Sequence, residues 1–388
     1  MRVVVAIDSL KGSLTSIQAG EAVSRGIRRV DPNADIQVRP LADGGEGTVD
    51  ALVSGMNGRK RRITVTGPLG NPVECGYGII ETGNTAVIEM SGAAGITLVA
   101  EKDRNPLYTT TFGVGEVIRD AIANGCRTFI VGIGGSATND GGVGMLQALG
   151  YEFRDAEGRE VSPGAGGLAE LYSITDEKVL PELKECVFKV ACDVTNPLCG
   201  PVGCSAVYGP QKGATPSMIR EMDGWLHNYA KLAKKQYAKA DPEYPGAGAA
   251  GGLGFAFLTF TNAVLESGIQ IILEETKLES YIKSADLVIT GEGRLDGQTA
   301  MGKAPVGVAK MGKKYGKPVI AFAGSVTQDA GACNQNGIDA FFPILRTIVT
   351  LEEAMNPQNA QNNMADTAEQ VMRLWNTISA SKDVVVRC

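Results

Sequence analysis

The chain opens with residues 1–8, which read MRVVVAID. The five apolar residues from Val3 to Ile7 predict a buried strand, and the acid that follows marks its end. A helical stretch over residues 15–30 and a second strand over residues 36–39 come next. A strand, a helix and a strand in this order predict a parallel sheet, so the loops at the carboxyl ends of these strands share one edge.

The last third of the chain repeats this alternation. Its expected elements are strands over residues 287–290, 318–323 and 340–342 and helices over residues 303–315 and 364–379. Residues 61–90 differ, because short strands separated by Gly, Pro and Asn turns predict an antiparallel meander. A parallel pattern at both ends of the chain predicts an inserted second domain. We expect a discontinuous α/β domain from residues 1–58 and 277–388 and a mixed α/β insertion from residues 59–276. The sequence leaves open which of the two domains contains residues 101–150.

Composition excludes several classes of protein. The 388 residues carry 37 Lys and Arg against 43 Asp and Glu, a net charge of −6, which argues against a nucleic-acid partner. No apolar run approaches the roughly 18 residues of a membrane helix, and the start does not resemble a signal peptide, so we expect a cytoplasmic protein without membrane contact. The eight cysteines form no C-x-x-C pair, which predicts free thiols and no zinc. His227, the single histidine, lies in a polar helical stretch and is expected on its surface, which argues against a Ser-His-Asp triad.

Glycine makes up 50 of the 388 residues, and much of it is grouped in short loops. The loop over residues 132–142 follows an apolar strand and precedes a helix, so its backbone N–H groups suit phosphate or carboxylate oxygens; a tight turn without a ligand is the alternative. The residues expected to contact such an anion are Gly134, Gly135, Ser136, Ala137, Thr138, Asn139, Asp140 and Gly141. The G-x-G-x-x-G of residues 246–251 follows no strand, so phosphate contact and a flexible helix entry are equally open there.

A third loop, residues 290–304, contains G-x-x-x-x-G-K. It is not a Walker A loop, because Ala304 replaces the Ser or Thr that would hold Mg²⁺ and because six residues separate the strand end from the first glycine. A phosphate site of another design stays open. In that case Arg294 or Lys303 would be the cation, and Glu292 or Asp296 would lie near metal or substrate. A surface ion-pair network is the alternative.

Acids also follow the other predicted strands. Asp8, with Lys11 close behind, ends the first strand, Asp43 follows the second, and Asp193 follows a strand over residues 187–191. Capping of turns and helices is the alternative for the first two segments. With no useful histidine, proton abstraction from an alcohol falls to a carboxylate, and Asp193 is a candidate base.

Five blocks of sequence resemble a known family. They are residues 8–14, 41–48, 134–142, 192–201 and 290–296. Block by block they are similar to the bacterial glycerate kinase family of type 1, which includes the glycerate 2-kinases. The resemblance implies a flavodoxin-like, doubly wound parallel α/β domain with an inserted mixed α/β domain and the active site in the cleft between them. It also implies ATP-dependent phosphorylation of D-glycerate with Mg²⁺.

Physical argument then assigns roles to the candidate residues. The ATP phosphates would lie against the 134–142 loop, assisted by Lys303, with Mg²⁺ held by some of Asp193, Glu292 and Asp296. Glycerate's carboxylate would be bound by Lys11 or Arg294, and Asp43 or Asp193 would accept the hydroxyl proton. Asp8, Ser9 and Glu46 complete the predicted substrate-binding set.

Alternatives stay open at this point. The resemblance favours the 2-hydroxyl of glycerate, and transfer to the 3-hydroxyl is the runner-up. A nicotinamide-dependent hydroxy-acid dehydrogenase would need a ribose-binding acid, for which Glu152 or Asp155 is available. A non-catalytic sensor of a small acid is the third reading. A homodimer is the candidate assembly.

Overall fold

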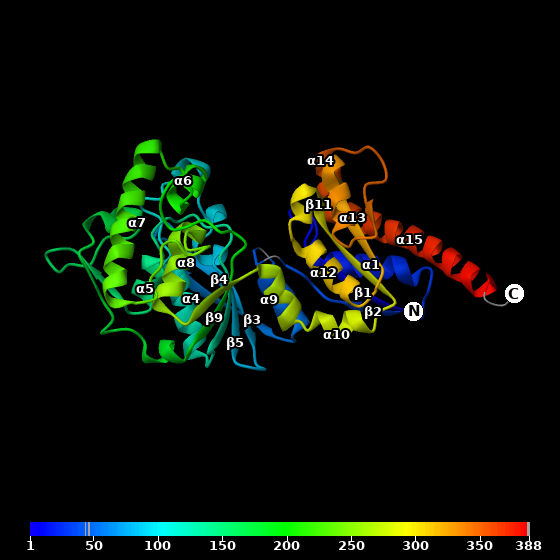
Figure 1. Cartoon of the computed structure of the whole chain (residues 1–388), viewed down its shortest axis with the longest axis horizontal. Helices are drawn as coiled ribbons and strands as arrows, with labels where there is room; N and C mark the ends of the chain where they lie inside the picture. The colour runs from blue at the N-terminus through cyan, green and yellow to red at the C-terminus, as the bar shows by residue number, and fades with distance from the viewer. Residues whose placement is uncertain (43, 46, 386–388) are drawn as a thin grey trace. The chain divides into compact units, whose positions relative to one another are not determined.

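Figure 1 shows the computed structural model of the chain, which forms two compact units. Unit 1 comprises Met1–Asp43, Asp50–Met56 and Ile272–Cys388, and unit 2 comprises Gly44–Val49 and Asn57–Ile271. The structure describes residues 1–42, 44, 45 and 47–385, with side-chain surroundings up to residue 378. Asp43 and Glu46, two of the predicted site residues, lie outside the described residues. The domain boundaries predicted from the sequence, after residues 58 and 276, stay a prediction.

The sheet of unit 1 has five strands, all parallel. Their spatial order is β13 (Ala340–Pro343), β12 (Val319–Val326), β11 (Leu287–Leu295), β1 (Arg2–Ile7) and β2 (Asp35–Val38). Counted along the chain within this unit, that is the 2-1-3-4-5 order of the flavodoxin-like, doubly wound fold. The α/β fold class and the parallel sheet predicted from both ends of the chain are confirmed.

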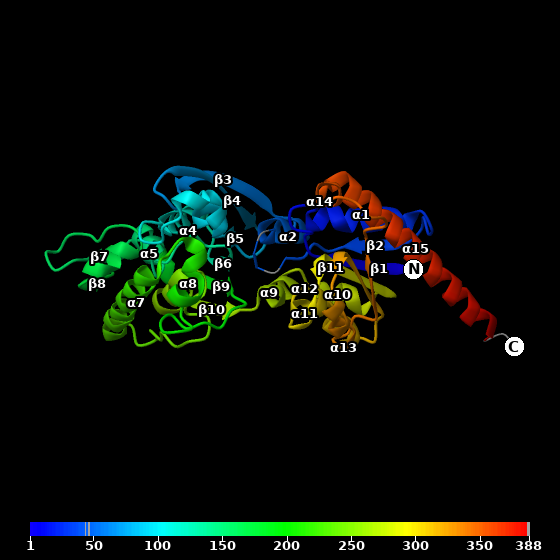
Figure 2. The ribbon, with the colours of Figure 1, turned by 90° about the horizontal axis from the view of Figure 1, so that it is seen from above.

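Helices cover both faces of this sheet (Figure 2). One face carries α1 (Ser16–Arg28) and α15 (Pro357–Val385), and the other carries α12 (Ala304–Lys314). The remaining helices in this part of the chain are α2 (Thr48–Gly55), α9 (Gly268–Glu275), α10 (Leu278–Lys283), α11 (Gly297–Ala300), α13 (Ala332–Gln335) and α14 (Leu351–Met355). Because side chains alternate along a strand, Val3, Val5 and Ile7 share one face and pack with Val23 of α1 and Met364 of α15.

Two elements are longer than predicted. The strand expected to end at residue 290 continues to Leu295, with Glu292 opposite Ala323 and Arg294 opposite Ser325 of β12. Its polar side chains suggested a loop, but backbone pairing at the end of a sheet does not need apolar side chains. The final helix begins at Pro357, before its apolar stripe, because proline is well tolerated in the first turn.

Unit 2 contains a six-stranded mixed sheet. Its spatial order is β10 (Ala263–Glu266), β9 (Val187–Ala191), β6 (Thr128–Gly132), β5 (Thr85–Glu89), β4 (Pro72–Ile80) and β3 (Arg59–Thr66). The pairs β3–β4 and β4–β5 are antiparallel, which confirms the predicted meander, and the other pairs are parallel. A separate hairpin joins β7 (Glu152–Arg154) to β8 (Ser173–Thr175). Residues 101–150, which the sequence left unassigned, belong to this unit.

The helices of unit 2 pack around this sheet. They are α3 (Ser91–Ala94), α4 (Phe112–Ala123), α5 (Val143–Ala148), α6 (Cys204–Tyr208), α7 (Pro216–Gln236) and α8 (Ala249–Phe260). His227 is exposed on α7, as predicted. The seven cysteines before Cys388 are free thiols, also as predicted. Among the described helices, none is both long and apolar enough to cross a membrane.

The glycine motif of residues 246–251 packs inside unit 2. Its residues are buried, apart from half-buried Ala250, and Ala250, Gly251 and Gly252 have positive φ angles before the regular part of α8 begins. A Cβ on Gly251 would lie 2.1 Å from the carbonyl oxygen of Thr138. The motif is therefore a helix entry pressed against the 132–142 loop, and of the two readings left open the structure supports this one.

Candidate active site

The carboxyl ends of β1 and β11 bring together the first group of predicted residues. Asp8 directly follows β1, and its backbone N–H donates to the carbonyl of Gly291 in β11 at 2.9 Å. Its buried carboxylate accepts the N–H of Ser9 at 2.7 Å. A Cβ on Gly293 would lie 3.5 Å from the backbone nitrogen of Lys11, so the backbone there runs beside β11. The structure therefore gathers Asp8, Ser9 and Lys11 along the far end of β11.

The far end of β11 carries the charged residues of the third loop. Arg294 is 66% exposed, and its Nε lies 3.7 Å from Oδ2 of Asp296. Asp296 caps α11, since its Oδ1 accepts the N–H groups of Gln298 at 3.0 Å and Thr299 at 3.1 Å. Glu292 accepts the Thr299 hydroxyl at 2.6 Å. The ion pair considered as the alternative is thus present, and each carboxylate has one oxygen committed to α11.

Glu292 and Asp296 are the predicted metal ligands of unit 1, and both contact the hydroxyl of Thr299. Mg²⁺ in nucleotide sites is commonly held by one or two carboxylates together with phosphate oxygens and water. Within the described residues no three His, Cys, Asp or Glu side chains gather into a metal-binding group. Glu292 and Asp296 provide carboxylate oxygens, the kind of donor that Mg²⁺ prefers.

Lys303, the predicted phosphate cation of the third loop, is the half-buried residue directly before α12. Its backbone is extended, at φ −63° and ψ 172°, and Pro305 occupies the first turn of the helix. Lys303 therefore stands at the amino end of an eleven-residue helix, where the helix dipole favours an anion.

In unit 2 the carboxyl ends of β6 and β9 are packed with glycine. A Cβ on Gly132, at the end of β6, would lie 2.2 Å from the carbonyl oxygen of Gly44, and a Cβ on Gly44 would lie 2.5 Å from the Cβ of Ala191 in β9. Only glycine allows backbone this close. Asp193 follows β9 with its side chain exposed, and its Oδ1 accepts the N–H of Gly268 at 3.2 Å. The exposed acid thus lies at the same edge of the sheet as the start of the glycine loop.

The glycine loop is exposed only at its start. Gly134 and Gly135 are exposed and Ser136 is 8% exposed, whereas the following residues are enclosed by protein. Ala137 donates its N–H to the carbonyl of Ala94 at 2.9 Å. The part of the loop that can meet a ligand is therefore shorter than the predicted set.

The buried part of the loop is held by its own hydrogen bonds. The Asp140 carboxylate accepts the N–H and hydroxyl of Thr111 at 2.8 Å each and the N–H groups of Gly142 at 3.1 Å and Gly144 at 3.3 Å. Burial raises the pKa of Asp140, and these bonds oppose that shift. Asn139 donates to the Ser205 hydroxyl at 2.9 Å. Asp140 and Asn139 are bound to the protein itself, so we interpret them as supports of the loop.

This arrangement was compared with known proteins. The family model described as "Glycerate kinase family" matches residues 3–376. The chain belongs to the glycerate kinase family. Among the relatives, the glycerate kinase of Bacillus subtilis is 49% identical over 96% of this chain and 97% of its own length. The glycerate 2-kinase of Escherichia coli is 48% identical over 96% of this chain and 99% of its own.

A solved structure agrees with this membership. The crystal structure of a putative glycerate kinase 2 from Salmonella typhimurium matches with a TM-score of 0.90 and 46% identity, and it covers 99% of both chains. The family resemblance predicted from five blocks of sequence is confirmed. Membership of the glycerate kinase family makes the protein an enzyme, a kinase that uses ATP.

The acids that a dehydrogenase would need are engaged elsewhere. Glu152 accepts from Lys178 at 2.8 Å and from Arg154 at 2.6 Å, and Asp155 accepts from Arg159 at 2.8 Å. These ion pairs belong to the β7–β8 hairpin and the turn after β7. Nothing in this geometry favours a dinucleotide site over the glycerate kinase assignment.

Sequence reasoning missed Lys212, which lies between α6 and α7. Its side chain is 2% exposed, and its Nζ donates to Ser136 Oγ at 2.7 Å and to the carbonyl of Thr138 at 2.5 Å. Burial lowers the pKa of Lys212 to about 8. The surrounding sequence, GPQKGA, reads as an ordinary surface turn, so it gives no signal of a buried lysine.

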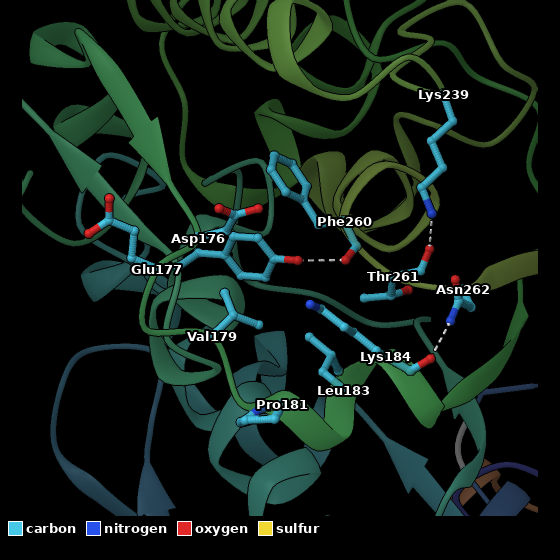
Figure 3. A pocket seen from close by; sticks show the side chains of 11 residues that line it. Asp176, Glu177, Val179, Pro181, Leu183, Lys184, Lys239, Phe260, Thr261 and Asn262 are labelled. Atoms are coloured by element: carbon cyan, nitrogen blue, oxygen red, sulfur yellow. Dashed lines mark hydrogen bonds between the residues drawn. The ribbon is translucent and has the colours of Figure 1, made fainter.

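A pocket of about 470 Å³ lies elsewhere in unit 2 (Figure 3). Its lining includes Lys184 before β9 and Asn262 before β10, so it opens at the amino ends of the strands, the edge opposite the glycine loop. Tyr151 and Phe260 both line the pocket, and the Tyr151 hydroxyl donates to the carbonyl of Phe260 at 2.7 Å. It contains none of the predicted site residues.

Proposed function

We propose that this member of the glycerate kinase family transfers the γ-phosphoryl group of ATP to the 2-hydroxyl of D-glycerate and releases 2-phosphoglycerate. The observation that carries the proposal is the exposed start of the glycine loop, Gly134 and Gly135, at the same sheet edge as the exposed carboxylate of Asp193. The Escherichia coli relative, 48% identical, is named glycerate 2-kinase, which supports the choice of hydroxyl.

The phosphates of ATP would be bound by the exposed start of the loop. Backbone N–H groups at Gly134 and Gly135 can approach phosphate oxygens closely because no side chain intervenes. The buried residues from Ala137 to Gly141 would act by holding this segment rigid. Phosphoryl transfer depends mainly on positioning and charge neutralisation, so a rigid cradle is the main contribution of the loop.

Mg²⁺ would be held by carboxylates from the set Asp193, Glu292 and Asp296. When bound, it neutralises charge on the β- and γ-phosphates. Glu292 and Asp296 lie close together, because each has one carboxylate oxygen within hydrogen-bond distance of the Thr299 hydroxyl. Lys303, at the amino end of α12, would add a positive charge for the phosphates.

Glycerate would be oriented through its carboxylate. Lys11 and Arg294 are the candidate cations, and Arg294 is free enough to reach a ligand because two-thirds of its side chain is exposed. Asp8 and Ser9 would position the Lys11 segment, since Asp8 is hydrogen-bonded to both Gly291 and Ser9. Asp193 would accept the proton of the attacking hydroxyl. Asp43 and Glu46 stay predictions, as do Mg²⁺, the cytoplasmic location and the homodimer.

The proposal is tested by ADP release. Purified protein with MgATP is given D-glycerate, L-glycerate, glycolate or D-lactate, and ADP formation is followed for each. We expect turnover with D-glycerate and little with glycolate and D-lactate, because each of those acids lacks one hydroxyl of glycerate. Equal ADP release with and without any acid would contradict a glycerate-specific kinase.

A further inference from the structure

The buried Lys212 side chain is hydrogen-bonded to the glycine loop within unit 2. The residue lies in a short turn, Pro210–Lys212, that follows α6. Its two hydrogen bonds, to the hydroxyl of Ser136 and the carbonyl of Thr138, tie that turn to the loop. Gly135, the neighbour of Ser136, is exposed. The buried amine therefore contacts the loop directly behind the segment that can meet a ligand.

The surroundings of Lys212 keep its charge available near neutral pH. Burial lowers its pKa to about 8, and the negative charge of the Asp140 carboxylate acts against that shift. Burial raises the pKa of Cys204 to about 11 and that of the nearby Tyr229 far above its usual range, so both stay neutral. A group with a pKa of about 8 is roughly nine-tenths protonated at pH 7.

Hydrogen-bond chemistry then fixes the role of Ser136. An ammonium group only donates, whereas a serine hydroxyl donates once and accepts twice. Among the described residues, the hydrogen-bond partner of the Ser136 hydroxyl is the Lys212 amine. Because that bond occupies a lone pair of the hydroxyl, the hydroxyl hydrogen is left to be donated to another oxygen.

We propose that Lys212 is a positioning residue for ATP: its buried ammonium holds Ser136 so that the serine hydroxyl donates to a phosphate oxygen bound at Gly134 and Gly135. The charge behind the loop also favours a phosphate in front of it, because a buried charge is only weakly screened. This inference rests on the proposed binding of phosphate at the start of the loop.

The test replaces Lys212 by methionine, which keeps most of the volume and removes both the charge and the donors. We expect the Lys212→Met variant to raise the KM for MgATP by about tenfold or more, as for a lost charge-assisted hydrogen bond, with the KM for D-glycerate unchanged. Lys239→Met is the matched control, since Lys239 also donates to a backbone carbonyl of unit 2, that of Thr261, away from the loop. An unchanged KM for MgATP in a folded Lys212→Met protein overturns the inference.

A double-mutant cycle separates this role from a merely structural one. If Lys212 acts through Ser136, Ser136→Ala raises the KM for MgATP, and adding it to Lys212→Met changes little further. Fully additive effects would contradict the relay. Gly134→Val tests the underlying proposal, because its Cβ would have ordinary contact, 3.6 Å from Gly45, while its side chain would crowd a bound phosphate. An effect of Gly134→Val without one of Lys212→Met rejects only the relay, and no effect of Gly134→Val overturns both.

A second measurement needs no change at Lys212, in case Lys212→Met fails to fold. Raising the pH from 7 to 9 removes most of the Lys212 charge, while Cys204 and Tyr229 remain neutral. The KM for MgATP of the wild-type enzyme should therefore rise across this range. In Ser136→Ala the rise should be clearly smaller, and identical pH profiles for the two proteins would overturn the inference.

Discussion

At the scale of single residues, Asp193 has the clearest combination of position and exposure. Its carboxylate is exposed after β9, yet one oxygen is fixed by the Gly268 N–H at 3.2 Å. An acid that is both oriented and accessible can take a proton from a substrate hydroxyl or contact a metal. Both of these roles depend on the negative charge.

The Asp193→Asn variant keeps the acceptor for Gly268 and loses the charge. We expect kcat for glycerate-dependent ADP release to fall by about 10²- to 10⁴-fold with an unchanged melting temperature. Asp176→Asn is the matched control, because Asp176 is an exposed acid of the same unit that accepts a hydrogen bond from Tyr237. Near-normal turnover of Asp193→Asn would remove it from the reaction.

Substitution of Lys11 should affect KM, whereas substitution of Asp193 should affect kcat. A residue that binds the substrate equally in the ground state and the transition state affects mainly KM. We expect Lys11→Ala to raise the KM for D-glycerate by about tenfold or more, as for a lost charge-assisted hydrogen bond. Lys310→Ala, at an exposed position on α12, is the control. Steady-state kinetics with each substrate varied in turn provide the readout. An effect confined to the KM for ATP would reassign Lys11 to phosphate binding.

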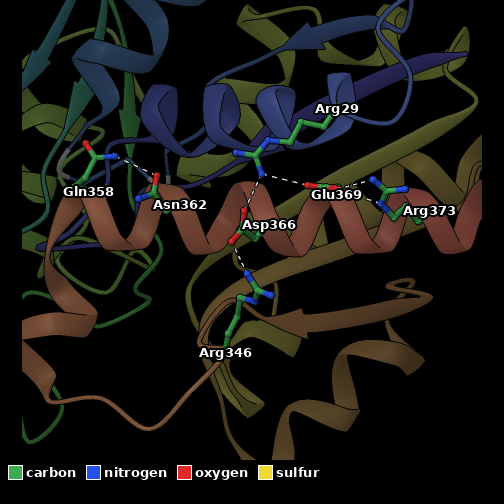
Figure 4. A network of polar contacts seen from close by, with 7 residues as sticks. All are labelled: Arg29, Arg346, Gln358, Asn362, Asp366, Glu369 and Arg373. Atoms are coloured by element: carbon green, nitrogen blue, oxygen red, sulfur yellow. Dashed lines mark hydrogen bonds and ion pairs between the residues drawn. The ribbon is translucent and has the colours of Figure 1, made fainter.

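At the scale of elements, the packing of α1 on α15 combines an apolar core with a polar edge. Figure 4 shows the edge, where Arg29, the residue after α1, contacts Asp366 at 2.7 Å and Glu369 at 3.2 Å, and Arg346 also contacts Asp366. Arg29 is 47% exposed, so solvent screens these pairs. The stability of the packing should therefore come mainly from its buried side chains.

Ile27, near the end of α1, and Arg29, the residue that follows the helix, test whether the buried side chains or the ion pairs supply this stability. Ile27 is fully buried in the core of unit 1, so Ile27→Ala should lower the free energy of unfolding by about 2–5 kcal/mol. Arg29→Ala should lower it much less, because solvent screens the ion pairs of Arg29. Urea denaturation followed by tryptophan fluorescence measures both, and equal losses would contradict the assignment.

The entry of α8 carries the other prediction at this scale. Gly251 has φ +68°, and a Cβ there would lie 2.1 Å from the Thr138 carbonyl oxygen, so Gly251→Ala should destabilise unit 2 by about 2–4 kcal/mol. Gly224 is exposed on α7 and has nothing within 4 Å of its Cβ position. Gly224→Ala should therefore stabilise the protein by about 0.5–1 kcal/mol. Thermal unfolding of the pair checks both signs, and a neutral Gly251→Ala would contradict the packing.

At the scale of the whole molecule, the order of elements could be predicted where local pattern and packing agree. The run from Val3 to Ile7 is apolar because the strand is covered on both faces, so the parallel sheet was visible in the sequence. The sequence did not predict the carboxyl end of β11. Glu292 and Arg294 have charged side chains there, but their backbone groups pair with β12. The family was recognised from its blocks, whereas periodicity alone predicted only the α/β class.

The candidate site was predictable in part. Loop residues such as Asp140 have the composition of a ligand site, yet four protein donors occupy this carboxylate. Lys212 was missed because a lysine is rarely fully buried, and its partners Ser136 and Thr138 are more than 70 residues away along the chain. Burial and long-range contacts, which depend on the whole fold, decide which polar residues face a ligand.

The central claim is that the phosphoryl group is transferred to the 2-hydroxyl of D-glycerate. ³¹P NMR of the product formed from MgATP and D-glycerate, compared with 2-phosphoglycerate and 3-phosphoglycerate standards, tests it most directly. The account predicts a single new phosphomonoester signal that coincides with 2-phosphoglycerate and grows in step with ADP. A signal that coincides with 3-phosphoglycerate, or ADP formed with inorganic phosphate alone, would contradict it.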